Sequence, residues 1–202
     1  MYGPFAVGAS PFRTKGNVYR ALLEAFDVQV PGGASAVLSR LEGPEVKAFF
    51  EQQFLVGSMY DILPLLEASM MSARVANQGW REFVRGGGRF QAERDLNGIY
   101  KMMLKLATPR QVVERLPRML IRYFDFGRVE GAASQRTRYE AAVHDIPKPV
   151  WPWLSAVAEG FIPFVMSNAG AKDATVIMHP PTPTGVRAGM GLLTGLFSVT
   201  WS

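Results

Sequence analysis

The chain has 202 residues, of which 48% are hydrophobic and 19% charged, and its formal net charge is +5 at pH 7. This composition is typical of a folded domain with a substantial core and excludes a disordered chain. The absence of cysteine excludes disulfides, thiolate zinc sites and cysteine nucleophiles. No apolar run reaches the roughly 18 residues of a membrane-spanning helix, and the N-terminus does not resemble a secretory signal. We therefore expect a cytoplasmic protein.

The first half of the chain is expected to be helical. Residues 1–13 mix Gly, Pro, Phe and Ser, which predicts an extended arm ahead of a single domain over 14–202. The run Gly86-Gly87-Gly88 predicts a flexible turn, because glycine is poorly suited to a helix interior. It lacks the Lys-Ser/Thr ending of a phosphate-binding loop. Before this turn, apolar spacing predicts helices over about 17–26, 34–41, 44–53, 60–75 and 78–85.

Residues 93–129 carry the clearest pattern in the sequence. Apolar residues follow helical spacing from Leu96 to Leu106 and again from Val112 to Phe124. Thr108-Pro109 predicts the start of the second helical region, with threonine as the N-cap and proline at the first helical position. After Phe126-Gly127 the apolar period approaches two, which indicates strands.

The last third is expected to complete a sheet. Strands are predicted over 128–133, 138–145, 174–179 and 195–201, with a helix over 153–168. The segment 180–194, rich in Pro and Gly, is too long for a tight hairpin turn and is expected to be mobile. The predicted fold is therefore α+β, with N-terminal helices packed on a C-terminal antiparallel sheet of β-β-α-β-β order.

Short motifs are spread over residues 14–202. They are Lys15-Gly16-Asn17-Val18, Phe54-Leu55, Met59-Tyr60, Asp95-Leu96, Ile99-Tyr100, Leu104-x-Leu106-x-Thr108-Pro109, Glu114-Arg115-Leu116-Pro117, Tyr123 to Val129 and Phe197 to Trp201.

These motifs resemble those of an uncharacterised bacterial family with many paralogues in myxobacteria. That family is distantly similar to haem–nitric-oxide-binding domains and to 4-vinyl-reductase/TRAPP-like ligand-binding domains. The resemblance implies a sensor-type fold and a recognition role in bacterial signalling. Its relatives often carry cysteines near the C-terminus, so their absence here argues against a thiol-based role.

The resemblance raises the question of haem. Haem–nitric-oxide-binding domains ligate iron through a histidine on a helix and hold the propionates with a Tyr-x-Ser-x-Arg motif. Here the predicted central helices contain no histidine, and Tyr139-Glu140-Ala141 does not match the motif. We therefore expect no haem, and we predict no other cofactor and no metal.

An apolar ligand is the hypothesis that remains. The chain has 10 methionines and 13 phenylalanines, and methionine fills irregular space and adapts to variable ligands. Ordinary core packing explains such a composition, and the alternative is an apolar cavity between helices and sheet. The candidate ligand-binding residues are Tyr60, Tyr100, Met103, Tyr123, Phe124 and Trp153.

A basic helix face is the candidate anion site. Arg115, Arg118 and Arg122 follow i, i+3, i+7 spacing and share one face of the predicted helix. Such a face either binds an anion or is simply solvated. Nucleic acid is not the expected partner, because the aromatic residues are predicted to be buried rather than interleaved with exposed cations.

Two histidines bear on catalysis. His144 and His179 end predicted strands beside prolines, and we interpret both as surface residues rather than metal ligands or bases. The favoured function is thus non-enzymatic recognition of an apolar small molecule or a partner protein. Two alternatives stay open: a structural homodimerisation or interaction module with a filled core, and an enzyme that uses His144 and Asp145.

Overall fold

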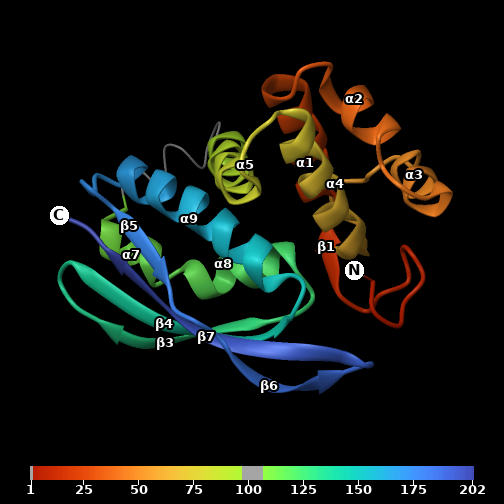
Figure 1. The fold of residues 1–202 in the computed structure, drawn as a ribbon. Helices are drawn as coiled ribbons and strands as arrows, with labels where there is room; N and C mark the ends of the chain where they lie inside the picture. The colour runs from red at the N-terminus through yellow and green to blue at the C-terminus, as the bar shows by residue number, and fades with distance from the viewer. Residues whose placement is uncertain (1, 97–106) are drawn as a thin grey trace.

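A layer of helices covers one face of an antiparallel sheet (Figure 1). The computed structural model describes residues 2–96 and 107–202. The α+β prediction, with N-terminal helices packed on a C-terminal antiparallel sheet, is confirmed. None of the helices in the described ranges is long and apolar enough to cross a membrane.

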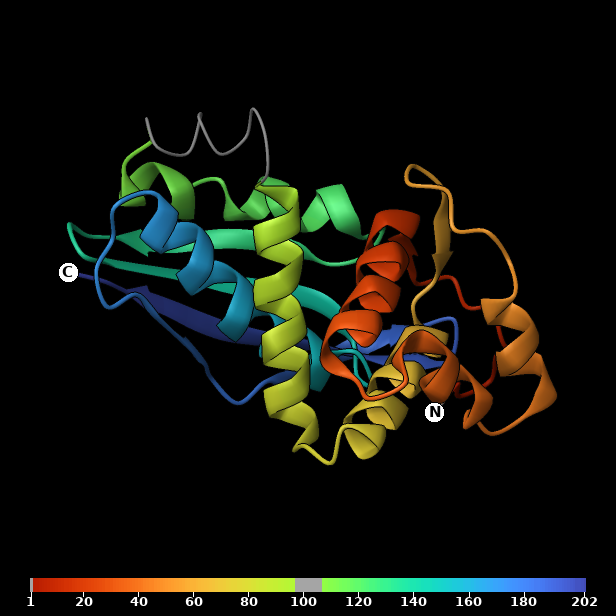
Figure 2. The ribbon, with the colours of Figure 1, turned by 90° about the horizontal axis from the view of Figure 1, so that it is seen from above.

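The N-terminal half is mainly helical. Two short strands pair there in antiparallel fashion and join the chain entering the first helix to the chain entering the fourth. Figure 2 shows α5 running across the strands, between the N-terminal helices and α9. The elements are β1 (Arg13–Lys15), α1 (Gly16–Gln29), α2 (Gly33–Ser39), α3 (Pro44–Phe50), β2 (Met59–Asp61), α4 (Leu63–Val75) and α5 (Trp80–Asp95).

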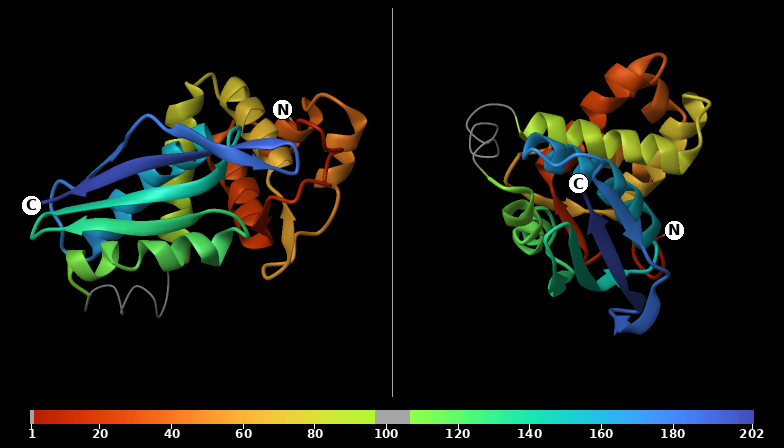
Figure 3. Two further views of the ribbon diagram at one scale, coloured as in Figure 1. Left: turned by 90° about the horizontal axis from the view of Figure 1, so that it is seen from below. Right: turned by 90° about the vertical axis from the view of Figure 1, so that its left-hand side faces the viewer.

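The C-terminal half supplies the sheet and the helices against it. Strand β7 is the centre of the sheet: β4 pairs with one of its edges, and β5 and β6 pair with the other. Seen from below, the strands lie in front of the helices, so one sheet face is open (Figure 3). The elements are α7 (Pro109–Val113), α8 (Leu116–Tyr123), β3 (Arg128–Ser134), β4 (Arg138–Pro147), α9 (Trp151–Asn168), β5 (Thr175–Met178), β6 (Thr182–Arg187) and β7 (Met190–Thr200).

The prediction of a mobile connection over 180–194 is wrong, because this segment forms a hairpin. Strand β6 pairs with the first half of β7, from Thr182 opposite Thr194 to Arg187 opposite Met190. Ala188 and Gly189 between them have φ of 51° and 81°, and a two-residue hairpin turn with both central φ values positive matches the twist of its strands. The proline in β6 is tolerated beside a bulge at an edge.

The prediction of a turn at Gly86-Gly87-Gly88 is also wrong, because α5 continues through all three residues. A β-carbon on Gly88 would overlap the backbone of Val157 on α9, and one on Gly160 of α9 would overlap the backbone of Arg85. Glycine therefore lets the two helices approach closely. The packing gained there outweighs the low helix propensity of glycine.

The helix predicted over 60–75 begins later than expected. Residues 59–61 belong to β2, and α4 starts at Leu63. The Asp61 carboxylate accepts a hydrogen bond from the Leu63 N–H at 2.9 Å, which competes with continued helix on its N-terminal side. The same carboxylate accepts hydrogen bonds from the Ser10 N–H at 3.1 Å and the Ser10 hydroxyl at 2.5 Å.

The N-terminal residues pack onto the core. Phe12 is fully buried, and the Arg187 guanidinium lies 5.2 Å from the centre of its ring. Pro4 contacts the turn of the β6–β7 hairpin at Gly189. Residues 2–12 thus connect the helical part of the molecule to the far end of the sheet.

Candidate functional site

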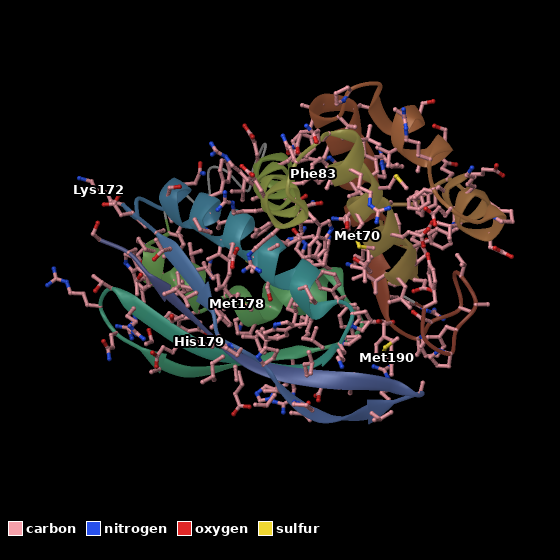
Figure 4. All side chains as sticks on the ribbon, in the orientation of Figure 1. Met70, Phe83, Lys172, Met178, His179 and Met190 are labelled. Atoms are coloured by element: carbon pink, nitrogen blue, oxygen red, sulfur yellow. The ribbon has the colours of Figure 1, made fainter. Side chains whose placement is uncertain are left out.

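An apolar cavity of about 160 Å³ lies between the helical layer and the sheet. Helices α1, α4, α5, α8 and α9 and strands β3, β4, β5 and β7 contribute to its described walls. Phe83 on α5 and Met178 on β5 come from the two opposite layers (Figure 4). Among the described residues, six aromatic side chains line it: Phe83, Tyr123, Phe124, Trp153, Phe161 and Phe197.

Small residues at the crossing of α5 and α9 form one part of the wall. Gly87 and Gly88 line the cavity from α5, and Ala158 lines it from α9. The space beside Gly88 is occupied by α9, whereas a β-carbon on Gly87 would meet no atom within 4 Å. Close-packed cores seldom leave such space. The cavity exists beside this crossing because Gly87 leaves room that a larger side chain would occupy.

Helix α8 has a mainly apolar side that faces the cavity and a basic side that faces solvent. Leu116, Met119, Leu120 and Tyr123 line the cavity. The opposite side carries Arg115, Arg118 and Arg122, which are all exposed, as is Ile121 at 63%. The structure thus places the three arginines on the solvent side of a helix whose other side borders the cavity.

The structure brings together three of the six predicted ligand-binding residues. Tyr123, Phe124 and Trp153 line the cavity, and the Phe124 and Trp153 rings meet edge to face with centroids 6.2 Å apart. Tyr100 and Met103 lie outside the described residues. Tyr60 lies elsewhere: its hydroxyl accepts from the Leu55 N–H at 2.9 Å and its ring contacts Phe54.

Sequence reasoning missed most of the wall. Phe197 and Met178 face each other across β7 and β5, and Phe83 and Phe161 come from α5 and α9. Alternation along β7 marks Phe197 as inward-facing, which is a usable signal. No sequence pattern shows that these residues border a space instead of a filled core.

The polar side chains among the described lining residues are already hydrogen-bonded. The Ser69 hydroxyl donates to the Leu66 carbonyl at 2.7 Å and accepts from the Trp80 indole N–H at 3.0 Å. The Gln91 amide donates to the Asp95 carboxylate at 2.8 Å, and the Tyr123 hydroxyl donates to the same oxygen. The Asp95 carboxylate therefore joins α5 to α8 at the cavity wall.

The histidines lie away from the cavity. On β4, His144 Nδ1 is 3.4 Å from the Thr194 hydroxyl and Nε2 is 3.5 Å from a Glu130 carboxylate oxygen. His179 follows β5 and is exposed. Neither is among the residues that line the cavity. Within residues 2–96 and 107–202, no group of three or more His, Asp or Glu side chains is placed to hold a metal ion.

An enzyme of the kind considered above would need His144 and Asp145 to act together, but the two side chains contact different groups. Asp145 has a φ of 58° at a bulge in β4, and its carboxylate lies 3.7 Å from Arg128 Nε. His144 instead contacts Glu130 and Thr194, on the open side of the sheet. Neither His144 nor Asp145 lines the cavity.

The fold is similar to that of H-NOX proteins. An unliganded Fe(II) H-NOX protein from K. algicida matches with a TM-score of 0.66 and 8% identity, over 93% of this chain and 96% of that one. An oxygen-binding H-NOX domain related to soluble guanylate cyclases gives 0.61 and 11%, over 93% and 95%. An H-NOX protein from S. oneidensis in the Fe(II)NO state gives 0.60 and 13%, over 93% and 99%.

At such low sequence identities, the structural similarity to H-NOX proteins shows the fold alone. No protein-family model and no curated protein matches the sequence. The chain therefore has an H-NOX-like fold, and what it binds must be argued from its own side chains.

The side chains of the cavity do not fit a histidine-ligated haem. The sequence contains two histidines, both on the sheet and outside the cavity, and residues 97–106 contain none. None of the described lining residues is a lysine or arginine that would pair with a haem carboxylate. Iron ligation by histidine is thus unavailable here, and the described walls offer the propionates no cation.

Proposed function

We propose that the protein is a haem-independent recognition domain that binds a small apolar molecule in the cavity between its helices and its sheet. The observation that supports this most directly is an apolar cavity of about 160 Å³ lined from both layers. The H-NOX-like fold adds support, because similar structures include an oxygen-binding domain. We infer a non-enzymatic, sensor-type role in signalling from the same likeness.

The size of the cavity limits the ligand. An engineered apolar cavity of about 150 Å³ in another protein stays dry and binds benzene or xenon, whereas drug-sized ligands occupy pockets of about 300–1,000 Å³. A cavity of about 160 Å³ therefore suits a molecule with one ring or a short branched chain. Its binding energy comes mainly from apolar surface removed from water.

The open face of the sheet gives less support to a partner-binding function. Ile177 and Leu196 are each 55% exposed there, and they lie diagonally on paired strands, since Ile177 is opposite Ser198. The ion pair of Arg138 with Glu140 at 2.6 Å lies on β4 in the same sheet. Two exposed apolar side chains fall short of the contiguous patch that marks a protein interface.

Thermal unfolding with and without toluene tests the proposal. A ligand that binds only the folded state raises its stability by RT ln(1 + [L]/Kd), or about 2.7 kcal/mol at 100 times Kd. We expect toluene to raise the melting temperature of the wild type. Gly87→Leu, which places a side chain into the cavity, should lose this response.

The control is Gly86→Leu, the same change one residue earlier on α5. Gly86 does not line the cavity, and a β-carbon there would have only the Gln29 side chain near it, at 3.7 Å. Gly86→Leu should keep the toluene response. If neither toluene nor benzene shifts the wild-type melting temperature, the proposed function is wrong.

A further inference from the structure

We propose that the cavity selects by charge: it accepts uncharged single-ring molecules and excludes carboxylates of the same shape. This inference rests on the proposed function and concerns the chemical class of the ligand. It separates small neutral aromatics from aromatic and fatty acids, which share their apolar surface but carry a negative charge.

The described part of the cavity wall offers no counter-charge to an anion. None of the described residues that line the cavity carries a charge, and most of the lining is aliphatic or aromatic. An ionised carboxylate that leaves water for such surroundings loses its hydration without an ion pair in return. This penalty exceeds the hydrophobic gain from the few methylene groups that fit beside the charge.

The hydrogen-bond donors of the described wall are directed at partners within the protein. A buried carboxylate needs N–H or O–H groups directed at it. The Tyr123 hydroxyl and the Gln91 amide N–H both donate to the Asp95 carboxylate, and the Ser69 hydroxyl donates to the Leu66 carbonyl. The polar side chains of the described wall thus already use these donors within the protein.

The charged group bound to two polar side chains of the wall is negative. The Asp95 carboxylate is held directly behind Gln91 and Tyr123. The nearest arginine on the same helix, Arg94, is directed away to Glu24, with Nε and the carboxylate oxygen 2.6 Å apart. A second carboxylate in the cavity would face Asp95 across a wall of low polarity, where like charges repel strongly.

The aromatic walls favour a ring as the uncharged ligand. Tyr123 and Phe161 meet edge to face with centroids 6.3 Å apart and planes at 78°, and Phe124 and Trp153 do so at 83°. A ring placed among them finds both faces and edges of other rings, and such pairs add to the energy of area burial.

Nitrobenzene and benzoate form a matched pair of probes. The nitro and carboxylate groups have the same shape and the same number of electrons, but benzoate is an anion at pH 7 and nitrobenzene is neutral. Binding of each is measured at pH 7 by ligand-detected NMR and by isothermal titration calorimetry. The wild type is compared with Gly87→Leu, with Ala158→Leu as a second filling variant, and with the control Gly86→Leu.

We expect nitrobenzene to bind the wild type and Gly86→Leu, and benzoate to bind at least about a hundredfold more weakly, equivalent to about 2.8 kcal/mol. Both filling variants should lose nitrobenzene. Two variants on different helices guard against one that fails to fold, and thermal melts identify such a failure.

Two other results would overturn the inference, in different ways. If benzoate binds within tenfold of nitrobenzene and both filling variants lose it, the cavity binds ligands but does not select by charge. The proposed function would then stand without this inference. If nitrobenzene and toluene both fail to bind the wild type, or nitrobenzene binding survives in both folded filling variants, the cavity is not a ligand site and both proposals fail.

Discussion

Gly160 of α9 lies directly against the backbone of Arg85 on α5, with no room for a β-carbon between them. Gly88 of α5 makes the reciprocal approach to Val157. Two glycines on opposite helices thus fix how closely α5 and α9 cross, and the cavity opens beside that crossing. Because of this geometry, substitutions at neighbouring glycines of α5 should change stability differently.

Gly87→Ala and Gly88→Ala should shift stability in opposite directions. At Gly87 an added methyl group meets no atom within 4 Å, so alanine should stabilise the protein by about 0.5–1 kcal/mol through its better helix propensity. At Gly88 the methyl group would push α9 away, at a cost of about 1–3 kcal/mol or more. Urea unfolding of the two variants measures both. Equal effects would show that α5 and α9 are not in close contact.

Alkaline pH should destabilise the fold through buried tyrosines. Burial, followed by the hydrogen bond to Glu67, raises the pKa of Tyr2, and burial, followed by the charge of Asp61, raises the pKa of Tyr19. The unfolded chain releases these protons near pH 10, while the folded protein retains them. Stability is therefore complete below about pH 10 and falls as the pH rises above it.

Urea unfolding at pH 8 and at several values above pH 10 measures this loss. Tyr2→Phe removes one of the titrating groups and its hydrogen bond to Glu67 at 2.9 Å. The variant should start with lower stability at pH 8 but lose less of it as the pH rises. An identical pH slope for both proteins would show that Tyr2 titrates alike in the folded and unfolded states.

Haemin should not form a histidine-ligated complex with this protein. The reason is the position of both histidines on the sheet, away from the cavity. Absorption spectra of the protein titrated with haemin, oxidised and reduced, test this directly. A spectrum typical of histidine-ligated haem that disappears in the His144→Ala, His179→Ala double variant would contradict the prediction.

The arginine face of α8 is proposed to bind anions. Arg115, Arg118 and Arg122 are exposed, and side-chain changes there need not disturb the cavity side of the helix. Replacing Arg115 and Arg118 by Glu should reduce retention on heparin and leave the melting temperature within a few degrees. A matched control reverses Arg20 on α1 and Arg74 on α4, two exposed arginines away from α8. Equal losses in the two double variants would point to net charge rather than to a site.

The sequence predicted those parts of the structure that depend on local pattern. Alternation around Val143 and Phe197 predicted strands, and apolar spacing predicted the helix that became α9. The turn predicted at Gly86-Gly87-Gly88 was wrong because Gly88 packs against a helix more than 60 residues away in the chain. No local sequence pattern reveals such a contact. Strand β6 and the first half of β7 were missed because, over residues 180–194, three prolines and three glycines outnumber the apolar residues that mark a strand.

The candidate site was less predictable than the fold. Tyr60 and Tyr123 look alike in sequence, each on a strongly apolar stretch, yet Tyr60 packs against Phe54 and Tyr123 borders the cavity. Whether a side chain meets another side chain or a space depends on the sum of all packing around it. Whether a residue borders the cavity can therefore be read only from the three-dimensional structure.

The cavity also has a mechanical consequence. Over a mole of protein, a volume of about 160 Å³ amounts to about 96 mL, and the roughly 20–100 mL/mol by which proteins shrink on unfolding scales with such internal space. Since compression favours the state of smaller volume, filling this space should raise the pressure at which the domain unfolds. A ligand bound between α5, α8 and the sheet would occupy this space. Pressure unfolding would therefore detect a bound ligand as increased stability under pressure, even before the ligand is identified.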